Sequence, residues 1–172
     1  MYKTQMEAAR KGIITEQMKI VAEYEYKKPE EIRDFVAKGQ VVICGNKLHK
    51  CIEPKGIGSM LKTKINVNLG VSRDCKDYDI EMEKVQASIK LGADAIMDLS
   101  SHGNTQPFRR KLVSECPAMI GTVPVYDSVI HYQRDLATLT AKDFIDIIRL
   151  HAEDGIDFVP FIAVLQEKLL NR

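Results

Sequence analysis

The chain has 172 residues, of which 45% are hydrophobic and 28% are charged, a composition typical of one globular domain, or of one domain with a small appendage. Its 25 Lys and Arg residues nearly balance its 24 Asp and Glu residues, so we expect no nucleic-acid partner. No apolar run approaches the roughly 20 residues of a membrane span, and the first residues do not resemble a signal peptide. We therefore expect a cytoplasmic protein with no membrane partner.

The first part of the chain predicts three short helices. Thr15 can cap the second helix, Pro29 suits the first turn of the third, and Gly39 ends it. Residues 40–46 predict a short strand, and the proline and glycines that follow indicate an irregular connection. We predict that residues 1–63 form a helical N-terminal region with one short strand.

From residue 64 onward, apolar strands alternate with amphipathic helices. Strands are predicted to begin near residues 65, 94, 119 and 156, and Thr140 with Asp143 forms a capping box at the start of the last helix. This alternation is typical of βα units that build a parallel sheet. The fold class is therefore α/β, with a partial (β/α) barrel of about four parallel βα units over residues 64–164, followed by a tail at 165–172 that is aberrant for this pattern. A closed barrel has eight units and about 250 residues, so four units make half a barrel.

Polar or aromatic side chains follow each predicted strand. In parallel βα architectures the working groups lie at the carboxyl ends of the strands and in the loops after them. The residues at these points are Asn66, Asn68, Asp98, Ser100, Thr122 and Tyr126, with His102 and Asn104 in the loop before the next helix. They predict a polar cavity wall.

Each of these residues also has a plainer structural interpretation. Asn68 can form a turn, and Tyr126 can be a half-buried packing residue. Asp98 and Thr105 can cap the following helix, and Met97 lies in an apolar run that is expected in the core.

The histidines and cysteines do not predict a metal site. His49, His131 and His151 have no companion at ligand spacing, so we expect them to be solvated or capping side chains. The cysteines lack a Cys-x-x-Cys pair and are predicted to be ordinary reduced thiols: Cys44, Cys51, Cys75 and Cys116.

Four tracts between about Met6 and Phe158 carry a family resemblance: EAARKGIITEQMKIVAE, EPKGIGSMLKTKINVNLGVSRD, LGADAIMDLS and PAMIGTVPVYDS. They resemble the phosphomethylpyrimidine synthase (ThiC) family. The resemblance implies a homodimeric radical S-adenosylmethionine lyase with a (β/α) barrel behind a helical amino-terminal domain. Its implied substrate is the small molecule aminoimidazole ribotide, which the family rearranges to hydroxymethylpyrimidine phosphate in thiamine biosynthesis. The implied cofactors are a 4Fe-4S cluster, S-adenosylmethionine and a zinc-type divalent metal. By motif, the substrate-binding residues are Asn68 in KINVNLG, Met97 in AIMDLS and Tyr126 in GTVPVY.

Two substitutions depart from the family pattern. Residues 100–105 read SSHGNT where the synthases commonly read Ser-Thr-Gly-Gly-Asp, and Asp127 stands where they commonly have Gln. Both resemble the related 5-hydroxybenzimidazole synthases of anaerobic cobamide biosynthesis. That alternative has the same ribotide as substrate and a different product.

The carboxyl-terminal residues depart further. Where the family continues with a strand that carries a substrate-contacting His, this chain reads VPFIAVLQEKLLNR, with Ile162 at the position of that His. The cluster cysteines and metal histidines of the family have no counterparts here, so we assign no catalytic and no metal-binding residue. We expect a truncated enzyme fragment that is inactive by itself, and a one-base deletion near the Pro160 codon would account for its tail. The alternative is a non-catalytic binding module that retains part of the ribotide pocket.

Overall fold

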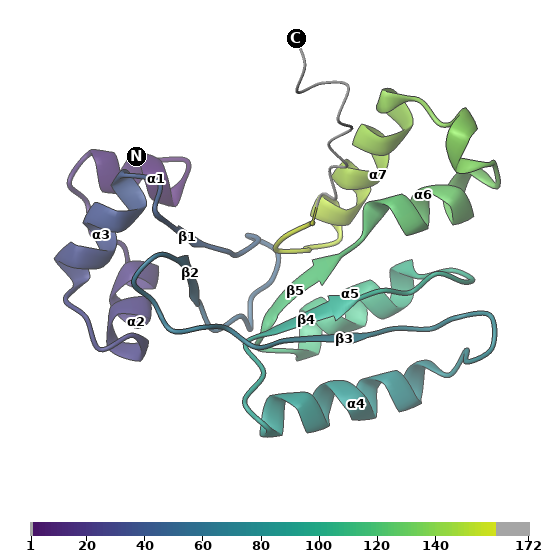
Figure 1. The fold of residues 1–172 in the computed structure, drawn as a ribbon, viewed down its shortest axis with the longest axis horizontal. Helices are drawn as coiled ribbons and strands as arrows, with labels where there is room; N and C mark the ends of the chain where they lie inside the picture. The colour runs from purple at the N-terminus through teal and green to yellow at the C-terminus, as the bar shows by residue number, and fades with distance from the viewer. Residues whose placement is uncertain (1, 161–172) are drawn as a thin grey trace, which may run out of the picture.

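The computed structural model describes residues 2–160, and its amino-terminal region is mainly helical (Figure 1). Three helices, α1 (Gln5–Arg10), α2 (Glu16–Tyr24) and α3 (Pro29–Ala37), precede a two-stranded antiparallel sheet of β1 (Val41–Ile43) and β2 (Gly56–Gly58). The three predicted helices and the first short strand are confirmed. Strand β2 lies where we expected an irregular connection, because a Gly-Ile-Gly strand has no alternating pattern of side chains.

Local capping explains where these helices begin. The hydroxyl oxygens of Thr4 and Thr15 accept hydrogen bonds from the backbone N–H groups of Glu7 and Met18, and Pro29 occupies the first turn of α3. Each cap satisfies backbone donors that have no partner inside the helix.

The second region is a parallel sheet with the strand order β3-β4-β5. Its strands are β3 (Asn66–Leu69), β4 (Ala95–Asp98) and β5 (Met119–Thr122). The helices that follow them are α4 (Tyr78–Lys90), α5 (Gln106–Glu115), α6 (Pro124–Tyr132) and α7 (Ala141–Glu153), with the 3-10 turn η1 (Leu136–Thr138) before α7. The barrel is open, as Figure 1 shows, and the predicted α/β class is confirmed.

The end of β5 differs from the prediction. We expected a strand through Val125, but β5 ends at Thr122 and α6 begins at Pro124. Proline has no N–H group for a sheet, and its fixed φ angle suits the first turn of a helix. The apolar run in this segment therefore divides between a strand and a helix.

The predicted fourth strand is described only as far as Pro160. Within that part, Phe158 forms an isolated parallel bridge with Gly121 of β5. The remainder of the strand and the predicted tail at 165–172 lie outside the described residues. The capping box that we predicted at the start of α7 is present, because the Thr140 hydroxyl accepts from the Asp143 N–H and the Asp143 carboxylate accepts from the Thr140 N–H.

The two faces of the parallel sheet have different surroundings. The outer face packs on α4 and α5 in a hydrophobic cluster that includes Leu69, Ile96 and Ile120. Because side chains alternate along a strand, Asn68 and Met97 lie on the opposite, inner face. A separate hydrophobic cluster holds the amino-terminal helices against β1.

Within residues 2–160, no helix is long and apolar enough to cross a membrane.

Buried polar contacts join the amino-terminal region to the sheet. The Tyr24 hydroxyl of α2 donates to the Asp94 carboxylate at 2.8 Å, and the other oxygen of Asp94 accepts from the Ile65 N–H at 2.9 Å. The hydrogen bond to Asp94 and burial raise the pKa of Tyr24 to about 12.

Candidate functional site

The strand register brings two of the three predicted substrate contacts together. Asn68 of β3 pairs with Met97 of β4, and Met97 pairs with Gly121 of β5. The Asn66 side-chain amide donates to the Asn68 Oδ1 at 2.9 Å, and both side chains are exposed. The inner face therefore presents an amide pair beside a methionine side chain of which 9% is exposed.

Gly121 and Phe158 complete this part of the inner face, and sequence reasoning did not select either. A Cβ at Gly121 would lie 2.5 Å from the Phe158 ring and 3.0 Å from the Met97 Sδ. The absence of a side chain at Gly121 thus allows the Phe158 ring to lie on the strand beside the Met97 sulfur. A glycine in a buried strand was the available sequence signal, because such glycines often mark a close approach.

Tyr126 lies apart from this pair. It is in the first turn of α6, just beyond the carboxyl end of β5, and 44% of its surface is exposed. No hydrogen bond joins it to Asn68 or Met97 within the described residues. The structure thus places Tyr126 after the expected strand, but on a helix that the sequence pattern did not predict.

The loops after β3 and β4 are held by short hydrogen bonds. Gly70 has a φ of 136°, and a Cβ there would lie 2.5 Å from the Ser100 N atom, so this position requires glycine. Its N–H donates to the buried Glu81 carboxylate at 2.8 Å. The Ser100 hydroxyl accepts from the Val71 N–H at 3.1 Å.

Asp98 and Thr105 do not cap α5 through their side chains. The Asp98 Oδ1 accepts from the Ser100 N–H at 2.9 Å, and burial raises the pKa of Asp98. The Thr105 residue is at the N-cap of α5, but its hydroxyl donates to Asp127 at 2.6 Å. Both capping interpretations are therefore wrong: Asp98 accepts from a neighbour in the loop after β4, and Thr105 donates to Asp127 of α6.

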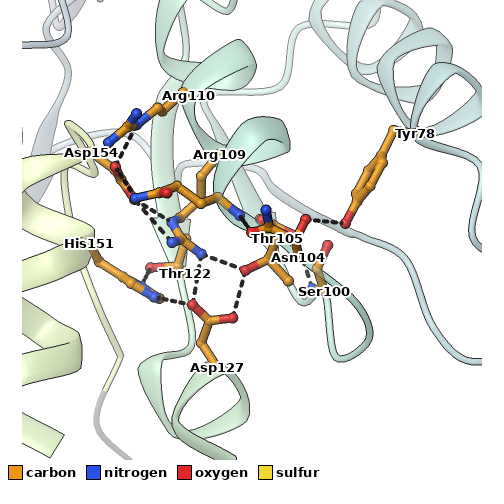
Figure 2. A network of polar contacts seen from close by, with 12 residues as sticks. Tyr78, Ser100, Asn104, Thr105, Arg109, Arg110, Thr122, Asp127, His151 and Asp154 are labelled. Carbon is orange, nitrogen blue, oxygen red and sulfur yellow. Dashed lines mark hydrogen bonds and ion pairs between the residues drawn. The ribbon is translucent and has the colours of Figure 1, made fainter. Parts of the chain in front are cut away.

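Asp127 is the centre of a buried polar network on the outer side of the sheet (Figure 2). Its Oδ1 accepts from Thr105, and its Oδ2 accepts from the Arg109 Nη1 at 2.9 Å and contacts the His151 Nε2 at 2.8 Å. Burial raises the pKa of Asp127, but the hydrogen bonds from His151 and Thr105 and the charge of Arg109 outweigh burial and lower it to about 2. Asp127 is therefore a carboxylate at neutral pH.

Arg109 links Asp127 to a second buried carboxylate, that of Asp154. The Arg109 side chain is 2% exposed, and its Nε and Nη2 donate to the Asp154 Oδ2 at 3.2 and 3.0 Å. Arg110 and Gln106 also donate to Asp154. Every buried side-chain nitrogen and oxygen of the described residues has a hydrogen-bond partner, so the network is fully satisfied.

Two of the three histidine predictions are wrong. His151 is 1% exposed and lies between Thr122 and Asp127, with its Nδ1 at 2.8 Å from the Thr122 Oγ1. His49 is 2% exposed and contacts Asp157 and the main-chain oxygen of Cys116. Their partners are 24 to 108 residues away in the chain, so local spacing carried no signal. His131 is exposed, as we expected.

Thr122, His151 and Asp127 have the composition of a nucleophile, a base and an orienting acid. Thr122 is only 2% exposed, however, and it lies on the outer face under the helices. A nucleophile must reach its substrate. We therefore assign these residues a structural role.

The described residues do not fit an iron–sulfur cluster or a bound metal. Within residues 2–160, no group of three or more His, Cys, Asp or Glu side chains could hold a metal ion. Burial raises the pKa of Cys116 to about 11 and also raises that of Cys44, which opposes the thiolate form that binds iron. We assign no reaction step through a cofactor to these residues.

The fold is an open half of a (β/α) barrel. Polar groups lie at the carboxyl ends of its strands. The chain belongs to the radical SAM ThiC family, whose family model matches residues 4–172. Membership implies S-adenosylmethionine and an iron–sulfur cluster as cofactors of the family.

Curated relatives agree with this assignment. The phosphomethylpyrimidine synthase of Alkaliphilus oremlandii is 57% identical over 164 residues, which are 95% of this chain and 38% of the relative. Those of Clostridioides difficile and Fusobacterium nucleatum are each 50% identical over 171 residues, which are 99% of this chain and 40% of the relative. The chain therefore spans about 40% of the length of the relatives that it matches.

Proposed function

We propose that the chain forms one wall of the ribotide-binding cavity of a phosphomethylpyrimidine synthase, a radical SAM lyase that converts aminoimidazole ribotide to hydroxymethylpyrimidine phosphate. The observation that carries this proposal is the register of Asn68 with Met97 at the carboxyl edge of a parallel sheet. Family membership and identities of 50 to 57% with phosphomethylpyrimidine synthases support it. The homodimer that the resemblance implies stays a prediction.

The three substrate contacts would have different chemical roles. The Asn68 Oδ1 already accepts from Asn66, so the Asn68 Nδ2 is the group that can donate to an acceptor atom of the ribotide. The Met97 thioether and the Phe158 ring would form an apolar surface for the flat imidazole ring. Tyr126 would contact the ribotide from the rim. We place the ligands of the cluster and of a zinc-type ion in the part of the relatives that lies beyond the span of this chain.

A titration followed by NMR tests the proposal. The full chain, labelled at its methionine methyl groups and tyrosine rings, is titrated with aminoimidazole ribotide up to millimolar concentration. One cavity wall binds a ligand weakly, so we expect a dissociation constant of about 1 mM or above, and shifts of the Met97 and Tyr126 signals. The N68A variant should bind more weakly, because it lacks the donor amide.

The matched control is Q86A, which removes an exposed amide from α4, on the outer side of the sheet. It should bind the ribotide as the unsubstituted chain does. Shifts confined to other methionines, or equal losses in N68A and Q86A, would contradict the proposed site.

The 5-hydroxybenzimidazole synthase is the second candidate, because residues 100–105 and Asp127 depart from the synthase pattern. Both enzymes use the same ribotide, so the titration does not separate them. The genes beside the coding sequence do: cobamide genes would favour the benzimidazole product, and thiamine genes the pyrimidine.

A further inference from the structure

Helix α6 carries Tyr126 but has little hydrophobic packing of its own. It follows β5 after the single residue Val123, and its buried residues are Pro124, Asp127 and Ser128. None of these is a large apolar side chain. Val125 and Ile130 are half-buried, so burial of apolar surface contributes less to the position of this helix than to those of α4 and α5.

A half-open pocket lies beside α6. Its volume is about 460 Å³, and its lining includes Thr105 and Arg109 at the start of α5, Asp127 and Ile130 of α6, and Leu150 of α7. Along this pocket α6 has no close-packed neighbour, so shape complementarity restrains it less there. The polar contacts of Asp127 cross this gap and restrain the helix.

These contacts approach Asp127 from two other helices. Thr105 and Arg109 donate from α5 at 2.6 and 2.9 Å, and His151 contacts it from α7 at 2.8 Å (Figure 2). Both carboxylate oxygens are used, so the group is fixed against rotation as well as displacement. Asp154 holds Arg109 in turn, through two further hydrogen bonds.

We propose that Arg109 and His151 are positioning residues for the ribotide. They hold Asp127, and Asp127 fixes the first turn of α6, from which the neighbouring Tyr126 reaches the carboxyl edge of the sheet. This inference rests on the proposed function, in which Tyr126 contacts the ribotide. Neither Arg109 nor His151 touches the substrate, since both are buried under the helices.

Hydrogen exchange of the full chain tests the restraint without any ligand. In D127N the second carboxylate oxygen is lost and the Arg109 charge lacks its partner on α6. We expect the amides of residues 123–132 to exchange at least about tenfold faster, while those of β3 and β4 change less than about twofold. The R109K variant keeps the charge but not the planar set of donors, and it should produce the same local effect to a smaller extent.

The matched control is D146N, which makes the same chemical change at a carboxylate of α7 whose ion-pair partners in residues 2–160 are Lys142 and Arg149. It should leave the exchange of α6 unchanged. Unchanged exchange of α6 in both D127N and R109K would overturn the proposal, and so would equal acceleration in all strands and helices. If D127N does not fold, R109K decides the question.

Ribotide binding gives a second readout. In D127N the ribotide-induced shift of Tyr126 should be lost, while that of Met97 persists, because only the helix has moved. If Asp127 only stabilises the fold, the ribotide-induced shifts of Tyr126 and Met97 should both persist in folded D127N. That result would overturn the proposal. If the ribotide causes no shift in the unsubstituted chain, the proposed function of this chain fails, and the exchange experiment alone decides whether Arg109 positions α6.

Discussion

His49 and His151 are both buried, and each contacts an aspartate, but their second ring nitrogens face different groups. The Nδ1 of His151 faces the Thr122 hydroxyl, which can donate, so a neutral ring with its proton on Nε2 satisfies both contacts. The Nε2 of His49 faces the Cys116 main-chain oxygen, which can only accept, while its Nδ1 faces Asp157. The carboxylate of Asp157 also accepts from the N–H groups of Asn46 and Ile120.

His49 therefore needs a proton on each nitrogen, and His151 does not. Burial lowers the pKa of His49, but the hydrogen bond and charge of Asp157 and the Cys116 oxygen outweigh burial and raise it. The charge of a buried histidine therefore follows from the donor or acceptor character of the groups that its ring nitrogens face. Substitutions and changes of pH at the two sites test this difference.

The largest effect is expected from R109L at the His151 site. The substitution leaves the buried carboxylates of Asp127 and Asp154 without their shared cation, and we expect a loss of about 3–5 kcal/mol in the free energy of unfolding. Urea denaturation at neutral pH measures it. The control R110L removes a cation whose side chain is 63% exposed and should cost less than about 1 kcal/mol. Similar losses of unfolding free energy in R109L and R110L would show that the buried network stabilises the fold no more than an exposed ion pair does.

Acid should weaken the same site. The folded pKa of Asp127 is about 2, below its ordinary value of 3.8, so its stabilisation is present above pH 3.8 and is lost as the pH falls toward 2. The contribution is about 2 kcal/mol at neutral pH. Denaturation curves between pH 2 and 6 should show a shallower acid limb in D127N than in the unsubstituted chain. An acid limb of equal slope in the two proteins would refute this.

T122V should cost about 1 kcal/mol, since valine has the shape of threonine but cannot donate to the Nδ1 of His151. Urea denaturation measures the loss, with T63V at an exposed position as the control. In T122V, nitrogen NMR should show a change at His151 and none at His49. If T122V is as stable as the unsubstituted chain, the Thr122 hydroxyl does not donate to the His151 ring.

Alkali should weaken the His49 site, with the smallest effect of the four because burial opposes the rise of its pKa. The folded pKa lies above the ordinary value of 6.5, so the stabilisation is complete below pH 6.5 and is lost as the pH rises through the folded pKa. Urea denaturation from pH 6 upward should show this decline in the unsubstituted chain and not in H49Q. The pH series should end at about 8, because burial raises the pKa of Cys44 and Cys116, and thiols of the unfolded chain that ionise above this pH would also weaken the fold.

The control for the alkaline limb is H131Q, since His131 is exposed. It should decline with pH as the unsubstituted chain does. Nitrogen NMR at neutral pH should show both ring nitrogens of His49 protonated, and a singly protonated His49 ring would contradict the assigned geometry.

Much of the fold could be predicted from local patterns. Thr15, Pro29 and the Thr140–Asp143 pair marked helix starts correctly, because capping depends on residues within one turn. The position of Asn68 near the end of its strand also followed from the alternation of strands and helices, whereas Met97 was selected by its motif and their register came from the structure. The start of α6 at Pro124 was missed, because the apolar pattern of a short buried strand runs on into the helix.

Sequence patterns were sufficient for the α/β class, for most of the helices and strands and, through the four motifs, for the family. Packing determines which polar side chains are buried and which atoms they face. Three different helices contribute Arg109, Asp127 and His151. No spacing along the chain predicts that these side chains contact one another. The physical reason is that helices and strands form through neighbours in sequence, whereas the charge of a buried group depends on partners that only packing brings near.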